Sequence, residues 1–119
     1  MGQTIRFREV LRRLAIVDES FIEDQVGLRL GSPSHRYLDP KTAALVQVGA
    51  LAAIGAPGVC LEWSTTRALA AGATEDEICD VLLVIAPAAG LGRVVGAVTD
   101  VADALGYDVE AELVDRDDH

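Results

Sequence analysis

The chain has 119 residues, of which 50% are hydrophobic but only 4% aromatic, so its apolar mass is mainly alanine, valine and leucine. A chain this short suits one domain and leaves much apolar surface uncovered when it folds alone, which favours a helical oligomer. A formal net charge of −9 argues against a nucleic-acid partner and against docking on an anionic membrane.

Two helices are predicted in the first third of the chain. Residues 4–15 carry apolar side chains at helical spacing, with basic residues between them. Asp18 is a suitable N-cap for a second helix that runs to about residue 30, where apolar residues again recur near period 3.6. The stretch GSPSHRY that follows is typical of a loop.

Capping residues define the next two helices. Asp39 and Pro40 predict the start of a third helix, because aspartate accepts from free backbone N–H groups and proline fits the first turn. Gly55 ends this helix. Pro57 predicts the start of a fourth helix, which Gly72 closes in the left-handed conformation that glycine tolerates best.

Two further helices complete an all-α prediction. Thr74 and Glu77 form a capping box that starts a fifth helix, over residues 74–89. A sixth helix covers residues 91–105 and stops at Gly106. No alternating pattern is long enough to predict a sheet. The acidic segment 108–119 is interpreted as a solvated terminus of a single 1–119 domain.

The long apolar run of residues 81–98 is interpreted as two helices that meet near Gly90, not as a membrane span. Pro87 and the charge of Arg93 both oppose a span, since a charge at mid-bilayer costs about 2.5–3.5 kcal/mol on insertion scales. The N-terminus has no apolar signal region. A cytoplasmic protein with two reduced thiols is therefore expected.

The fourth helix carries the residues best suited to chemistry. Residues three, four and seven apart share one helix face, so Cys60, Trp63, Ser64 and Arg67 form a single stripe. An arginine nearby and a place in the first helical turn both favour the thiolate form of Cys60. Cys79, on an apolar helix, is interpreted as a packing residue.

Purely structural interpretations of the same residues stay open. Cys60 also suits inert packing, and Trp63 suits a core or a subunit interface. Arg67 suits a helix-end carbonyl or a subunit ion pair, and Ser64 suits a bond to its own helix. The two histidines lie at positions 35 and 119, and neither they nor the two cysteines have metal-ligand spacing, so no metal or other cofactor is expected.

Residues 38–98 resemble the carboxymuconolactone decarboxylase family of the alkylhydroperoxidase-D-like superfamily. The resemblance is carried by LDPKTAALV, by GVCLEWSTTRALAAGATEDEI and by the APAAG that follows. It implies a six-helix, all-α bundle of alkylhydroperoxidase-D-like type that assembles into homotrimers or homohexamers, with sites near the subunit contacts.

The resemblance implies a peroxidase chemistry of which one of four parts is present. That branch uses a Cys-x-x-Cys motif, a histidine four residues later and an upstream glutamate. Cys60 matches the second cysteine, whereas Pro57 stands at the first and Ser64 at the histidine. Ala44 and Leu45 occupy the region where the acid is expected.

A second branch of the family decarboxylates a lactone that bears carboxylates. Arg67 and Arg93 are the candidates to hold such a substrate, with Trp63 as an apolar wall and Ser64 in place of the proton donor. Three hypotheses therefore stand: a thiol peroxidase based on Cys60, with Ser64 beside it; a lyase that acts on a small carboxylated lactone; and a non-catalytic oligomeric binding protein. The expected partners are other copies of the chain and a small carboxylate or peroxide.

Overall fold

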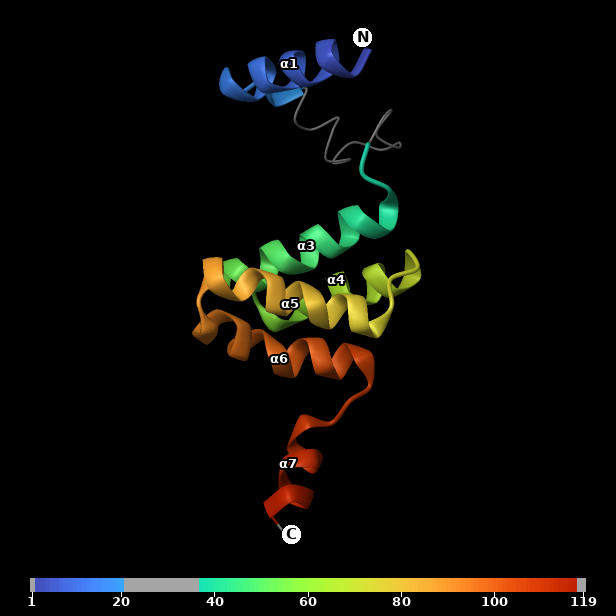
Figure 1. The fold of residues 1–119 in the computed structure, drawn as a ribbon. Helices are drawn as coiled ribbons and strands as arrows, with labels where there is room; N and C mark the ends of the chain where they lie inside the picture. Colours follow the sequence, from blue (N-terminus) through green and yellow to red (C-terminus); the bar gives the residue numbers. More distant parts are fainter. Residues whose placement is uncertain (1, 21–36, 118–119) are drawn as a thin grey trace. The chain divides into compact units, whose positions relative to one another are not determined.

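A computed structural model describes residues 2–20 and 37–117 of the chain (Figure 1). The chain divides into two compact units, residues 1–37 and 38–119. Every regular element in the described ranges is a helix, and six helices are present there. This confirms the all-α prediction.

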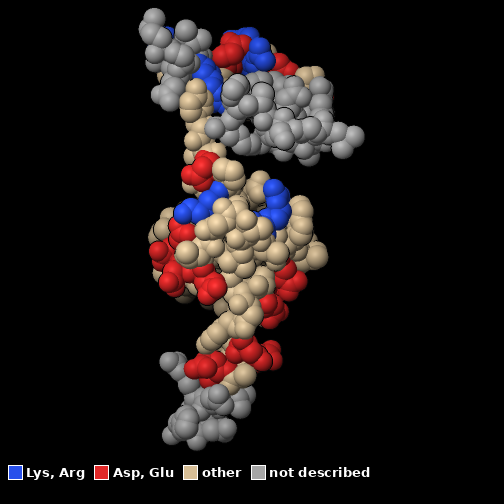
Figure 2. All heavy atoms as spheres, turned by 90° about the vertical axis from the view of Figure 1, so that its right-hand side faces the viewer, with Lys and Arg blue, Asp and Glu red and all other residues tan. Residues whose placement is uncertain are grey.

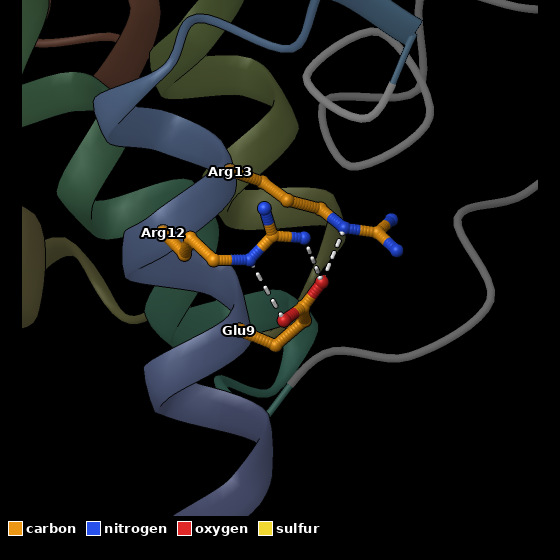
Figure 3. Close-up of polar contacts among 3 residues, drawn as sticks. All are labelled: Glu9, Arg12 and Arg13. Carbon is orange, nitrogen blue, oxygen red and sulfur yellow. Dashed lines mark hydrogen bonds and ion pairs between the residues drawn. The ribbon is translucent and has the colours of Figure 1, made fainter.

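The first unit contains α1, Gly2–Ala15. One carboxylate joins two arginines on its surface: Glu9 accepts hydrogen bonds from Arg12 and Arg13, each with a shortest distance of 2.8 Å (Figure 3). Glu19 and Ser20 are helical directly after Asp18, where the second helix was predicted to begin. The rest of that helix and all of the predicted loop except Tyr37 lie outside the described residues.

Four helices of the second unit form a bundle (Figure 1). They are α3 (Pro40–Ile54), α4 (Gly58–Ala70), α5 (Glu75–Ala89) and α6 (Leu91–Leu105). Contacts join α3 to α4 and α5, and α6 to the other three helices. The core is built of small and branched side chains, with Val48, Thr65 and Ile78 fully enclosed.

Local capping sets the ends of these helices, as the sequence predicts. The Asp39 carboxylate accepts from the Thr42 backbone N–H at 2.7 Å, which lowers the pKa of Asp39. Gly55 ends α3 with a φ of 68°. Both bonds of the capping box between Thr74 and Glu77 are present at the start of α5. Pro57 differs slightly from the prediction, because it is the N-cap of α4 and not a residue of its first turn.

The apolar run of residues 81–98 is divided between two helices, as predicted. Gly90, with a φ of 92°, ends α5 and precedes α6. Gly72, after α4, also has a positive φ, of 100°, which confirms its predicted role. Within the described ranges, no helix combines the length and the apolar character that a membrane crossing requires.

The acidic terminus is helical where the structure describes it. Helix α7 spans Val109–Asp117, and the Asp108 carboxylate accepts from the Ala111 backbone N–H at 3.0 Å at its start. Residues 110–113 are exposed, in agreement with a solvated segment. Acidic side chains also flank the helical bundle on the face shown in Figure 2, with uncharged atoms between them.

Candidate functional site

Helix α4 carries four of the five predicted site residues, and its N-terminal end holds Cys60. The backbone N–H of Cys60 donates to the Pro57 carbonyl at 2.9 Å, so the thiol lies in the first turn. Its side chain is half-buried and the thiol is free. Gly58 and Val59 precede it, and no side chain caps this end of the helix. Cys60 therefore has partial access to solvent beside uncapped backbone N–H groups.

Ser64 lies one turn after Cys60 but does not pair with it. The residue is only 4% exposed, and its Oγ has no hydrogen-bond partner in the described structure. The two threonines that follow bond instead to their own helix, Thr65 to the Leu61 carbonyl at 2.7 Å and Thr66 to that of Glu62 at 2.9 Å. The predicted bond of Ser64 to its own helix is therefore wrong, and its hydroxyl is buried without a partner, which is uncommon in folded proteins.

Trp63 and Arg67 form a separate surface pair. The Arg67 guanidinium carbon lies 4.9 Å from the centroid of the Trp63 ring, in the geometry of a cation–π contact. Trp63 is 64% exposed within the chain, so its interpretation as a core residue is wrong. The ring lines an open hollow of about 430 Å³, together with Glu62 of α4 and Asp103 of α6.

Arg93 is bound to the end of another helix. Its Nη1 donates to the Ile54 carbonyl at 3.2 Å, and its guanidinium lies over Gly55. A cation at a helix C-terminus is favoured by the helix dipole. Arg93 lines a hollow different from that of Trp63. The structure therefore brings Cys60, Trp63, Ser64 and Arg67 onto one helix but places Arg93 in a different hollow from Trp63.

One acidic residue that the sequence analysis missed approaches the Cys60 end of α4. A methyl group on Gly58 would lie 2.5 Å from Oδ1 of Asp100, so the α6 carboxylate lies directly against this turn. Asp100 is half-buried. The sequence offers one sign of this residue: it is an acid that lies between two positions of α6, Ala97 and Val101, that are buried. Sequence spacing alone does not connect it with a glycine 42 positions earlier.

The second cysteine is in a different environment from the one predicted. Cys79 is exposed on α5, so the interpretation of this residue as a packing side chain is wrong. It is also free, and no disulfide joins it to Cys60. The helical face that carries Ile78 is buried, and Cys79 follows it on the outer side. Cys79 is thus a natural control for the reactivity of Cys60.

A hollow larger than those of Trp63 and Arg93 lies elsewhere, between α3 and α5. It has a volume of about 890 Å³ and mainly apolar walls, and none of the predicted site residues lines it. Glu77 stands at its rim and pairs with Lys41 at 3.0 Å. The backbone N–H of Thr74 and this ion pair together lower the pKa of Glu77. The described residues contain no cluster of three or more His, Cys, Asp or Glu side chains able to hold a metal ion.

Comparison with protein-family models gives a match that covers most of the chain. The model described as Carboxymuconolactone decarboxylase family matches residues 26–104, which include all five predicted site residues and Asp100. Searches of curated proteins and of solved structures gave no match.

Proposed function

Because the chain belongs to the carboxymuconolactone decarboxylase family, we propose that it is a single-thiol peroxidase in which Cys60 reduces a small hydroperoxide. The observation that supports this proposal best is the carboxylate of Asp100 against Gly58, two residues before Cys60. An acidic group at this place provides a proton acceptor that the sequence lacks at Ser64. The thiol is half-buried and not enclosed, so a small substrate can reach it.

The reaction proceeds by nucleophilic attack of sulfur on the peroxide. Asp100 accepts the Cys60 thiol proton through an intervening water, and the thiolate attacks the terminal oxygen of the hydroperoxide. A bond between sulfur and oxygen forms, the O–O bond breaks, and the alkoxide takes the proton back from Asp100 as it leaves as an alcohol. Sulfur loses two electrons and the peroxide gains them, which leaves Cys60 as a sulfenic acid.

In this scheme an external thiol completes the cycle, and Cys60 and Cys79 both stay free thiols in the resting protein. One thiol attacks the sulfenic acid and releases water, and a second thiol releases Cys60 and forms an external disulfide. Dithiothreitol supplies both thiol groups in an assay. Ser64 takes no part in this scheme as a proton carrier, because its hydroxyl is buried and unpaired.

A non-catalytic binding protein is the second candidate function, and the state of Ser64 favours it. The family's peroxidase branch, as the resemblance implies, has a histidine where this chain has Ser64. A buried hydroxyl with no partner offers no route for a proton to solvent. The lyase hypothesis has less support, since Arg67 stacks on Trp63 while Arg93 binds the Ile54 carbonyl.

The test is the consumption of tert-butyl hydroperoxide by the full chain in the presence of dithiothreitol. Cys60→Ser should reduce the rate to the uncatalysed background, whereas Cys79→Ser should retain the wild-type rate. Asp100→Asn should lower the rate by about 10²–10⁴-fold, the usual contribution of a positioned base. Mass spectrometry of the peroxide-treated protein should find one added oxygen on Cys60. A Cys60→Ser protein as active as the wild type would exclude the mechanism, and the non-catalytic function predicts no turnover from any of these proteins.

A further inference from the structure

Helix α1 lies outside the family match, which begins at residue 26, and it carries exposed apolar side chains. Phe7 is 51% exposed, Leu11 59% and Leu14 47%. Their spacing of four and three residues places all three on one face of the helix. These three residues, here called the α1 stripe, therefore present apolar surface that is not buried in the core of the chain.

Arginines flank the α1 stripe on both sides. At about 100° per residue, Arg8 and Arg12 fall beside one edge of the stripe. Arg6 and Arg13 fall beside the other edge, and Glu9 lies on the face opposite the stripe. Glu9 is the one acidic residue of α1, and it pairs with two of the four arginines (Figure 3). The helix as a whole therefore keeps a positive charge.

The net charge of −9 belongs to the whole chain and is distributed unevenly. Helix α1 is basic, whereas α5 begins with three acidic residues and α7 has two in its first turn. The field of a charged surface in water decays over a Debye length of about 10 Å at about 0.1 M salt. Attraction to such a surface is therefore decided by the charge of the part in contact. The charge of the whole chain does not exclude an anionic surface as a partner of α1.

We propose that α1 binds along the surface of an anionic lipid bilayer. With 14 residues, α1 is shorter than the about 20 residues that a span requires, so it lies parallel to the bilayer. The α1 stripe enters the boundary between headgroups and acyl chains, and the arginines on both sides reach the anionic headgroups.

A bilayer accounts for both properties of α1. A nucleic acid would engage the arginines through its phosphates but would leave the α1 stripe in contact with water. An anionic bilayer accepts the cations and the apolar side chains together. This interaction goes beyond the proposed peroxidase function, because neither Cys60 nor Asp100 belongs to α1.

Co-sedimentation of the full chain with lipid vesicles tests this proposal. Vesicles of equal parts phosphatidylglycerol and phosphatidylcholine should bind the chain, and vesicles of phosphatidylcholine alone should not. Leu11→Ser should weaken binding by about tenfold or more, because it removes a large apolar side chain from the α1 stripe. Arg8→Gln should weaken binding by about fivefold, the share of one arginine near an anionic surface.

Two control variants should bind the anionic vesicles as the wild type does. Arg67→Gln removes the same charge from α4, which the proposal does not involve. Cys60→Ser removes the thiol of the peroxidase proposal, so its binding separates the failure of one proposal from the failure of the other.

Fluorescence gives a second measurement, because Trp63 is the one tryptophan of the chain. In a chain with Trp63→Phe and Phe7→Trp, the emission should shift to shorter wavelength when anionic vesicles are added. Both the shift and the co-sedimentation should diminish at about 1 M salt, where the Debye length falls to about 3 Å.

Four results would overturn the proposal. The first is equal binding to vesicles of phosphatidylcholine alone, and the second is normal binding of Leu11→Ser to anionic vesicles. The third is binding to duplex DNA but not to anionic vesicles, which would make a nucleic acid the partner of the arginines. The fourth is that Leu11→Ser splits an assembly of the wild-type chain in light scattering without lipid, because the α1 stripe would then serve a contact between copies.

Discussion

Glycine serves opposite purposes on α3 and on α6. A methyl group on Gly49 of α3 would lie 3.1 Å from Val81 and 3.3 Å from Ile85 of α5, so the absence of a side chain allows these two helices to approach closely. At Gly96 of α6 the same methyl group would meet nothing. One glycine thus allows a close contact inside the chain, while the other leaves a surface open.

Large apolar side chains are also exposed on α5 and α6. Leu83 and Val84 of α5 and Leu91 and Val95 of α6 are all exposed within the chain. Exposed apolar side chains in such number are typical of surfaces that bind a partner. The homotrimer or homohexamer that the family resemblance implies stays a prediction, and we expect its contacts at these exposed side chains.

The largest expected effect comes from a side chain placed in the closed contact. Gly49→Val should lower the free energy of unfolding by about 1–3 kcal/mol, because its methyl groups overlap Val81 and Ile85. Urea unfolding at a fixed protein concentration measures the change. The matched control is Gly92→Ala on the open side, which should leave stability unchanged or raise it by up to about 1 kcal/mol. Equal losses in both variants would show that the two regions do not differ.

The next largest effect on stability is expected at the start of α5, which has a side-chain cap, unlike the start of α6. Thr74 caps α5 through its hydroxyl, which accepts from the Glu77 backbone N–H at 3.0 Å, whereas no side chain caps α6. Thr74→Ala should therefore cost about 1 kcal/mol in the same urea experiment. The exposed Thr66, which bonds only to its own helix, provides the control, and Thr66→Ala should change stability by less than about 0.5 kcal/mol.

The smallest effect on stability is expected on the exposed surface of α1, where ion pairs and not buried contacts stabilise the helix. Hydrogen bonds from Arg12 and Arg13 lower the pKa of Glu9 from 4.5 to about 2 (Figure 3). Because the folded-state pKa is depressed, the stabilisation of α1 is complete above pH 4.5 and is lost as the pH falls through about 2. A carbon-13 NMR titration of the Glu9 carboxyl should give this midpoint. In Arg12→Gln the midpoint should move up toward 4.5, and an unmoved midpoint would mean that Arg12 does not hold the carboxylate.

The helix ends could be predicted closely because their causes are local. Asp39, Thr74 and Gly106 act on backbone groups within one turn of themselves, and each lies at the predicted end. The family resemblance was confirmed for the same reason, since the segments that carry it are continuous in sequence. The exposure of Cys79 was not predicted, because the sequence of an apolar helix does not show which of its faces another helix covers.

An all-α chain, the ends of its central helices and its family follow from the sequence alone. Three features could be seen only in the folded chain: Asp100 lies against Gly58, Arg93 lies over Gly55, and the Ser64 hydroxyl is buried without a partner. The physical reason is distance along the chain. Caps and periodicity act over a few residues, whereas these contacts depend on how α3, α4 and α6 pack against one another.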